Sequence, residues 1–349
     1  MLVVLCVVWV VLFALFLPFI LLAVIIAALL AVASPASNVP AHAGSDPATK
    51  YELTKRVAEA AKMLATHPRF KGMSESQREK AVEFITGNLI FVLGHEAGHA
   101  VIRQMDIPVT GREEDAADIF STLMALMCTD AFADRVLANA ALGWFFSDRR
   151  GRRRGDTLDY YDEHGLDLQR AYNVVCLMVG SNTTKFGGIA MAAKLPATRQ
   201  QTCVDDFLNA EWSWGDVLKA HLRKPDEPKT ELKVVYGPGK GKYDTHAEVA
   251  RHIRLLEAIA DNLSDRFVWR VPISLEMQAC GEVNARWIYR EKRVVVCYEL
   301  ADEFAQLYRQ YGRTMAFSLD PEVAAAPKPG REAAAVRKQK SLRAQRPAR

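Results

Sequence analysis

The residues best suited to chemistry in this 349-residue chain lie in one short stretch, His95-Glu96-Ala97-Gly98-His99. Apolar residues flank the stretch on both sides, which predicts a helix buried in a core. Residues i and i+4 of a helix share a face, so His95 and His99 can each present a ring nitrogen to one metal ion. Glu96 lies one position further round, where its carboxylate can hold a water molecule but cannot bind the same ion. Gly98 has no side chain and allows a neighbouring element to approach closely.

An acidic segment follows at the distance that a third metal ligand needs. Pro108 ends the first helix, and a second helix begins near Arg112 after a short turn. In this second helix Glu114 and Asp118 are again four residues apart, so both side chains can face the first helix. We expect Glu114 to be the third protein ligand of a catalytic zinc ion, which leaves the fourth position open. We expect Asp118 to accept the second ring proton of a ligand histidine.

Such a site predicts hydrolysis of an amide bond without a covalent intermediate. Zinc with three protein ligands lowers the pKa of its water towards 7 and polarises a carbonyl oxygen. Glu96 is then the general base, which takes the proton of the water and passes it to the leaving amine. A hydrogen-bond donor opposite the metal should stabilise the oxyanion. The candidates are His164, Tyr160 and Tyr161, and His164 is the first choice.

Both motifs resemble those of the glutamate-ligand zincin peptidases, in which a second helix bearing Glu-x-x-Ala-Asp follows the H-E-x-x-H helix. The segment Glu114-Asp115-Ala116-Ala117-Asp118 matches the second motif position for position. Most of residues 89–300 is also similar to a bacterial metallopeptidase family of unknown function, in the segments GHEAGH, GREEDAAD, DEHGLDLQRAYNVVCLMVG, EWSWGDVL and CGEVNARW…VVVCYEL. The resemblance implies a metal-dependent hydrolase that acts on peptide bonds, and it implies no particular substrate.

Two alternatives are consistent with the same residues. Only 14 residues lie between His99 and Glu114, fewer than in the better-known zincins, so the loop must climb back along the first helix. Glu113 or Asp115 can therefore replace Glu114 as the ligand. The non-enzymatic alternative is an envelope protein whose helices bind zinc for structure, or bind a partner.

The first 33 residues contain no charged side chain. Roughly 20 apolar residues cross a bilayer, so residues 1–33 predict a transmembrane anchor or a signal peptide. Small residues allow cleavage after Ala33 or Ala43, and residues 34–46 read as a linker rich in Pro, Ala and Ser. In both cases we expect the rest of the chain to be exported. The predicted location is the cell envelope, with attachment to the membrane through the N-terminal segment or secretion.

Charge is unevenly distributed along the chain. Residues 321–349 hold 8 basic and 2 acidic side chains, which is +6, so the net charge of +4 leaves −2 for the rest. This tail has no aromatic residue and is predicted to be disordered. A slightly acidic body argues against nucleic-acid binding. The expected partner is a peptide or protein substrate, and the sequence does not indicate an oligomeric state.

The predicted fold class is α+β and mostly helical, with a zincin-like pair of active-site helices in one metallopeptidase-like domain over residues 47–320. Predicted helices cover residues 47–66, 74–106, 112–142, 166–179, 196–209, 247–262 and 299–311. Predicted strands cover residues 271–277, 286–289 and 294–298, which would form a small C-terminal hairpin or sheet beside the active-site helix. The basic run 149–155 is predicted to be a loop. The Gly-rich segment 233–242 lacks phosphate-loop spacing, so no nucleotide site is expected there.

The remaining cysteines and histidines give further expectations. Cys280 and Cys297 are the first choice for a disulfide, and Cys176 with Cys203 is the second. Cys128 lies in an apolar run and is expected to be a buried thiol. The histidines at 221, 246 and 252 lie on polar stretches and are expected at the surface.

Overall fold

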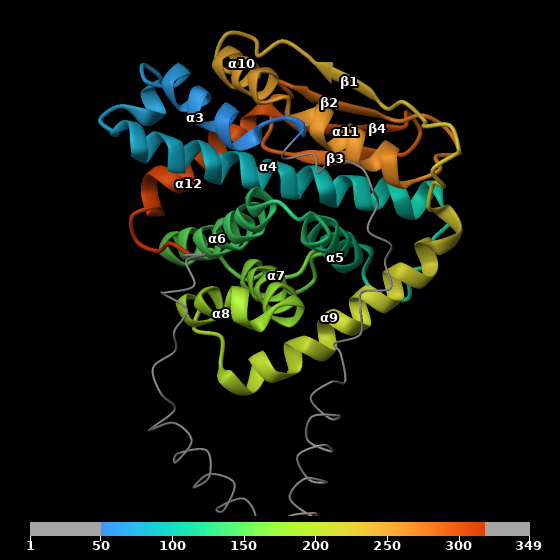
Figure 1. The fold of residues 1–349 in the computed structure, drawn as a ribbon. Helices are drawn as coiled ribbons and strands as arrows, with labels where there is room; N and C mark the ends of the chain where they lie inside the picture. Colours follow the sequence, from blue (N-terminus) through green and yellow to red (C-terminus); the bar gives the residue numbers. More distant parts are fainter. Residues whose placement is uncertain (1–49, 318–349) are drawn as a thin grey trace, which may run out of the picture. The chain divides into compact units, whose positions relative to one another are not determined.

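The computed structural model of the protein describes residues 50–317, and Figure 1 shows how its helices and strands are arranged. The predicted anchor or signal peptide (1–33), the linker (34–46) and the basic tail (321–349) lie outside the described residues. Within residues 50–317, no helix has both the length and the apolar character that a membrane span requires.

One long helix, α4 (Glu75–Gln104), runs between two layers of the fold (Figure 1). The first layer contains the helices α5 (Glu113–Leu126), α6 (Ala131–Arg154), α7 (Asp167–Ser181), α8 (Thr183–Ala192) and α9 (Ala197–Leu218). The second contains the sheet and the helices α3 (Leu53–Met63), α10 (Asp244–Ile253), α11 (Leu255–Arg266) and α12 (Tyr298–Tyr311). Short 3-10 turns lie at η1 (Pro68–Phe70) and η2 (Lys219–His221).

The sequence of α4 explains its central position. Ser74 begins the helix with a capping box, in which its side chain accepts the backbone N–H of Gln77 and the Gln77 side chain accepts the N–H of Ser74. From Ala81 onwards, most residues of α4 are buried on every side of the helix. A helix that is apolar all round must be enclosed by other elements. The buried half includes His95 and Glu96.

The sheet has four strands in the order β1-β2-β4-β3. The strands β1 (Lys233–Tyr236), β2 (Ser274–Gln278) and β4 (Arg293–Cys297) are parallel, and β3 (Ala285–Ile288) pairs antiparallel with β4 at one edge. Both β3 and β4 pack against α4. The described residues are mostly helical with this one small sheet, so the predicted α+β class is confirmed. Strand β1 is not among the predicted strands, although its Val234 and Val235 favour a strand.

Two predicted helices are each divided in the structure. The prediction over residues 112–142 is wrong because Asp130 accepts the backbone N–H of Phe132 at 2.6 Å and so begins α6 separately from α5. The prediction over residues 247–262 is wrong because Arg254, with φ of 59°, takes a left-handed conformation between α10 and α11.

The basic run 149–155 is helical, and its prediction as a loop is wrong. Helix α6 continues to Arg154, and Gly155 ends it with φ of 77°. Basic side chains in the last turn are favourable because the C-terminal end of a helix carries partial negative charge. Arg150 also pairs with Glu303 of α12.

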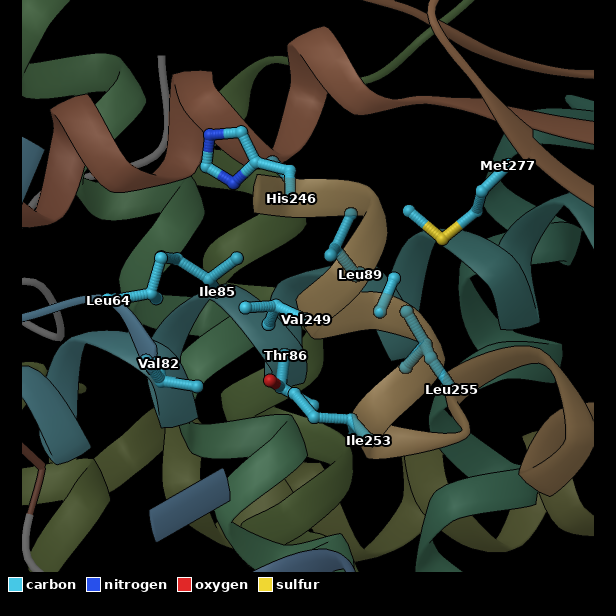
Figure 2. Close-up of a pocket in the computed structure, with 12 residues that line it drawn as sticks. Leu64, Val82, Ile85, Thr86, Leu89, His246, Val249, Ile253, Leu255 and Met277 are labelled. Carbon is cyan, nitrogen blue, oxygen red and sulfur yellow. The ribbon is translucent and has the colours of Figure 1, made fainter. Parts of the chain in front are cut away.

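His246 is buried, and its prediction as a surface residue is wrong. Figure 2 shows it beside apolar side chains of α4, α10 and the sheet, which together line a cavity of about 20 Å³. The cavity has room for a single water molecule and is almost entirely aliphatic. It therefore offers no space for a substrate.

Both predicted disulfides are present in the structure. Cys280 bonds to Cys297, which joins the segment before β3 to the end of β4. Cys176 bonds to Cys203, which joins α7 to α9. Cys128 is half-buried, so the prediction that it is fully buried is wrong.

A charged pair joins η1 to the last helix, α12. The Nε and Nη2 atoms of Arg69 each donate to Asp302 of α12 at 2.7 Å. Burial raises the pKa of the Asp302 carboxyl, but the bonds to Arg69 outweigh this effect and hold the pKa well below its usual range. The pair therefore stabilises the folded state while Asp302 is ionised.

Replacing Asp302 by Asn is expected to lower the free energy of unfolding by roughly 1–3 kcal/mol at pH 7, because it removes the charged partner of Arg69. In the unmodified protein this contribution is present above the unfolded-state pKa of about 3.9 and is lost as the pH falls below it. Urea unfolding at pH 7 and pH 3 measures both effects. The control is Glu52→Gln, which removes an exposed pair with Lys55 and should change the free energy by less than about 0.5 kcal/mol. Equal effects of the two substitutions would contradict this role.

Candidate metal centre

Helices α4 and α5 cross closely at two glycines. A Cβ atom at Gly98 would lie 3.1 Å from Ala117 Cα, and one at Gly94 would lie 2.5 Å from Ser121 Oγ. A side chain at these positions would push the two helices apart. The glycines therefore allow the acidic face of α5 to reach the histidines of α4, as the sequence predicted for Gly98.

The three predicted ligand atoms lie close together. His95 Nε2 is 3.2 Å from His99 Nε2 and 3.0 Å from Glu114 Oε2. His99 Nε2 is 3.3 Å from Glu114 Oε1. Tetrahedral zinc with bonds of 2.0–2.1 Å separates its ligand atoms by about 3.3 Å. The three side chains thus have the spacing of three corners of such a site, and the residues fit a metal.

A carboxylate contacts the other ring nitrogen of each helical histidine. His95 Nδ1 is 2.8 Å from Asp118 Oδ1, and His99 Nδ1 is 3.0 Å from Glu113 Oε1. Asp118 thus occupies the position that the sequence predicted. Glu113 contacts the outer nitrogen of His99 rather than the space between the Nε2 atoms. Asp115, the other alternative ligand, pairs with Arg112 at 2.8 Å.

Two arginines hold these outer carboxylates, and sequence reasoning missed both. Arg170 of α7 donates to both oxygens of Asp118 at 2.7 Å, and its guanidinium lies 3.8 Å from the Trp144 ring centroid. Arg103 donates to Glu113 at 2.7 Å. A buried acidic residue such as Asp118 requires a cationic partner. The sequence offered one sign of it, because Arg170 stands beside the apolar residues of α7.

The site attracts positive charge. Burial lowers the pKa of His99, but the Glu114 and Glu113 carboxylates outweigh it and raise the pKa to about 9. Burial raises the pKa of Glu114, yet hydrogen bonds from His164, His95 and His99 bring it far below its usual range. The same carboxylates would favour a bound metal cation, which competes with protons for the ring nitrogens.

Glu96 lies in a less polar environment than the ligand group. Burial raises the pKa of its carboxyl above the usual value, although the neighbouring His95 and His99 oppose this. The backbone N–H of Trp287 in β3 also opposes this rise in the pKa of Glu96, and β3 packs against α4. The edge strand of the sheet is therefore directly beside Glu96.

The structure brings one of the three predicted oxyanion donors to the site. His164, in the loop between α6 and α7, places its Nε2 atom 2.9 Å from Glu114 Oε2. Tyr160 and Tyr161 of the same loop are largely exposed. His95, Glu114 and His164 form a group whose ligand atoms all lie within 4.8 Å of one another.

Together, the helix pair and its histidine and glutamate side chains define a possible metal site of the H-E-x-x-H class. A family model described as "Putative metallopeptidase" matches residues 55–218 and 237–327, and the chain belongs to this family. The predicted resemblance is thereby confirmed. Membership implies a metal and suggests a hydrolase that acts on peptide bonds. Neither the comparison with curated proteins nor that with solved structures found a match.

Replacing Asp118 by Ala is expected to weaken Zn²⁺ binding about 10- to 100-fold, because His95 loses the carboxylate that orients its ring. Competition with a chromogenic chelator measures the affinity, and circular dichroism checks the fold. Asp115→Ala, three residues away on α5, is the control and should leave the affinity unchanged. Asp118→Asn, which keeps the shape of the side chain, covers the case in which the Ala variant does not fold. Wild-type affinity in a folded Asp118 variant would disprove the orienting role.

Proposed function

We propose that this protein is a zinc-dependent peptidase that hydrolyses a peptide or amide bond with water, with Glu96 as the general base. His95, His99 and Glu114 would hold the zinc ion, and Asp118 would orient His95. The observation that carries this proposal is the separation of 3.0–3.3 Å among the three ligand atoms. Two imidazoles and a carboxylate are a ligand set that zinc peptidases use.

The side chains around the proposed zinc ion have separate tasks. When bound, zinc lowers the pKa of a water molecule and polarises the substrate carbonyl. Glu96 takes the water proton and passes it to the leaving amine, and its raised pKa makes this return of the proton easier. Arg170 keeps Asp118 ionised and in place behind His95. The oxyanion role predicted for His164 stays a prediction.

The edge strand β3 supports a peptide as the substrate. In an antiparallel pair, alternate residues direct both backbone groups away from the partner strand. The carbonyl oxygen of Asn284 accepts the N–H of Cys297, so Asn284 faces β4. One and three residues later, Ala285 and Trp287 therefore direct their backbone N–H and C=O groups away from β4. The backbone N–H of Trp287, on this edge, lies near enough to Glu96 to lower the pKa of its carboxyl. An extended peptide that adds to β3 would therefore pass Glu96.

The proposed location is the cell envelope, with the chain anchored through residues 1–33 or secreted. Two disulfides support an oxidising compartment, because such bonds are rare in the cytosol. The proposed partner is a peptide or protein substrate. The slightly acidic body of the chain does not favour nucleic acid.

Replacing Glu96 by Gln should reduce peptide hydrolysis by about 10²- to 10⁴-fold, because the amide cannot accept the water proton. Zinc content should stay near that of the wild type. The measurement is cleavage of a fluorogenic peptide library by the full-length chain, with metal analysis of the same samples. Glu75→Gln, at the exposed start of α4, is the control. Undiminished hydrolysis by Glu96→Gln would exclude the base role. A wild-type chain that binds zinc and cleaves nothing favours the structural or partner-binding alternative.

Replacing Ala285 by Pro is expected to raise KM about 2- to 10-fold with little change in kcat, because the edge loses an outward N–H that a bound peptide would take over from Asn284 Oδ1. Proline is tolerated on an edge strand whose N–H does not join the ladder. Steady-state kinetics with the best library peptide measure the effect, and thermal unfolding checks the fold. Arg286→Ala changes an exposed side chain that pairs with Glu282 and leaves the backbone intact. A normal KM for the folded Ala285 variant argues against pairing at this edge.

A further inference from the structure

His164 contacts the Glu114 carboxylate through its Nε2 atom, as His95 and His99 of α4 do. The His164 Nε2 atom lies 2.9 Å from Glu114 Oε2. The corresponding separation from a Glu114 oxygen is 3.0 Å for His95 and 3.3 Å for His99. The Glu114 carboxylate thus contacts the Nε2 atoms of three histidines.

The outer nitrogen of His164 is also held in the same way. Its Nδ1 atom lies 3.0 Å from Asp162 Oδ1, which in addition accepts the backbone N–H of His164 at 2.7 Å. Each of the three histidines therefore has a carboxylate at Nδ1, in the pairs His95–Asp118, His99–Glu113 and His164–Asp162. A metal-binding histidine characteristically gives its second ring proton to such a group.

This arrangement suits the Nε2 atom of His164 to a metal ligand. A neutral ring that gives its Nδ1 proton to a carboxylate has a lone pair and no proton at Nε2. Such an atom can bind a metal cation. We propose that His164 is a fourth protein ligand of the metal, and that it leaves when the site opens. This inference rests on the proposed metal site of His95, His99 and Glu114, and it does not require that the site hydrolyse peptides.

The surroundings of His164 explain why it can leave. The side chains of His95 and His99 are 6% and 13% exposed and belong to a helix that is enclosed on all sides. The side chain of His164 is 42% exposed, and its partner Asp162 lies two residues away in the same exposed loop. His95 is thus held in a buried helix, whereas His164 lies in a largely exposed loop, residues 156–165. Four protein ligands close a zinc site, and the departure of one restores the open position of a catalytic site.

X-ray absorption at the zinc edge tests this ligand count. The full-length chain, purified without a histidine tag and loaded with one equivalent of Zn²⁺, should show three imidazole ligands. The His164→Ala variant should show two, with its Zn²⁺ affinity at least about tenfold lower. The matched control is His252→Ala, which removes a histidine of comparable exposure (29%) that pairs with Glu59 at 3.0 Å. That variant should keep three imidazoles and the wild-type affinity.

The outcomes separate the ligand from the proposed activity. Two imidazoles in the wild type, with an unchanged spectrum and affinity in His164→Ala, would overturn the inference. Peptidase activity that depends on Glu96 would still stand in that case. Three imidazoles without peptidase activity would support the inference and count against the catalytic function. A wild-type chain that binds no Zn²⁺ would overturn both.

Discussion

The architecture depends on the cost of placing ionisable side chains inside a helix that is enclosed on every side. His95 and Glu96 lie in the buried half of α4, where a charged or unpaired polar group is strongly destabilising. The neighbouring elements supply the partners that offset this cost. Helix α5 provides Glu114 and Asp118 to His95, and the backbone N–H of Trp287 in β3 favours the ionised form of Glu96.

These partners form a chain of contacts that crosses three helices. His95 on α4 contacts Asp118 on α5, and Asp118 is held by Arg170 on α7. The charge of each member is compensated by the next one, so these contacts help to fix the relative positions of the helices as well as the orientation of the His95 ring. The glycines at 94 and 98 are part of the same constraint, because any side chain there would separate the first two members.

The sequence allowed accurate prediction where local helix geometry decides the outcome. The positions of His95, His99, Glu114 and Asp118 follow from a spacing of four residues on two helices joined by a short loop. Arg170, Asp162 and Trp287 could not be found in this way, because their contacts depend on how α7, a loop and a strand pack. The left-handed backbone at Arg254 could not be predicted, because arginine has no preference for that conformation. The start of α6 did have one, since Asp130 is a favourable N-cap residue.

The direction of β3 has a consequence for the polarity of a bound peptide. Because β3 is antiparallel to β4, a peptide that pairs antiparallel with β3 runs in the same direction as β4. Its amino-terminal side then lies towards Ile288, and its carboxyl-terminal side towards Ala285. Trp287, the residue that contacts Glu96, lies near the Ile288 end of a strand of only four residues. If the proposed peptidase binds its substrate in this way, the pairing surface is unequal on the two sides of Glu96, with more of the strand available to the residues that follow the cleaved bond than to those that precede it.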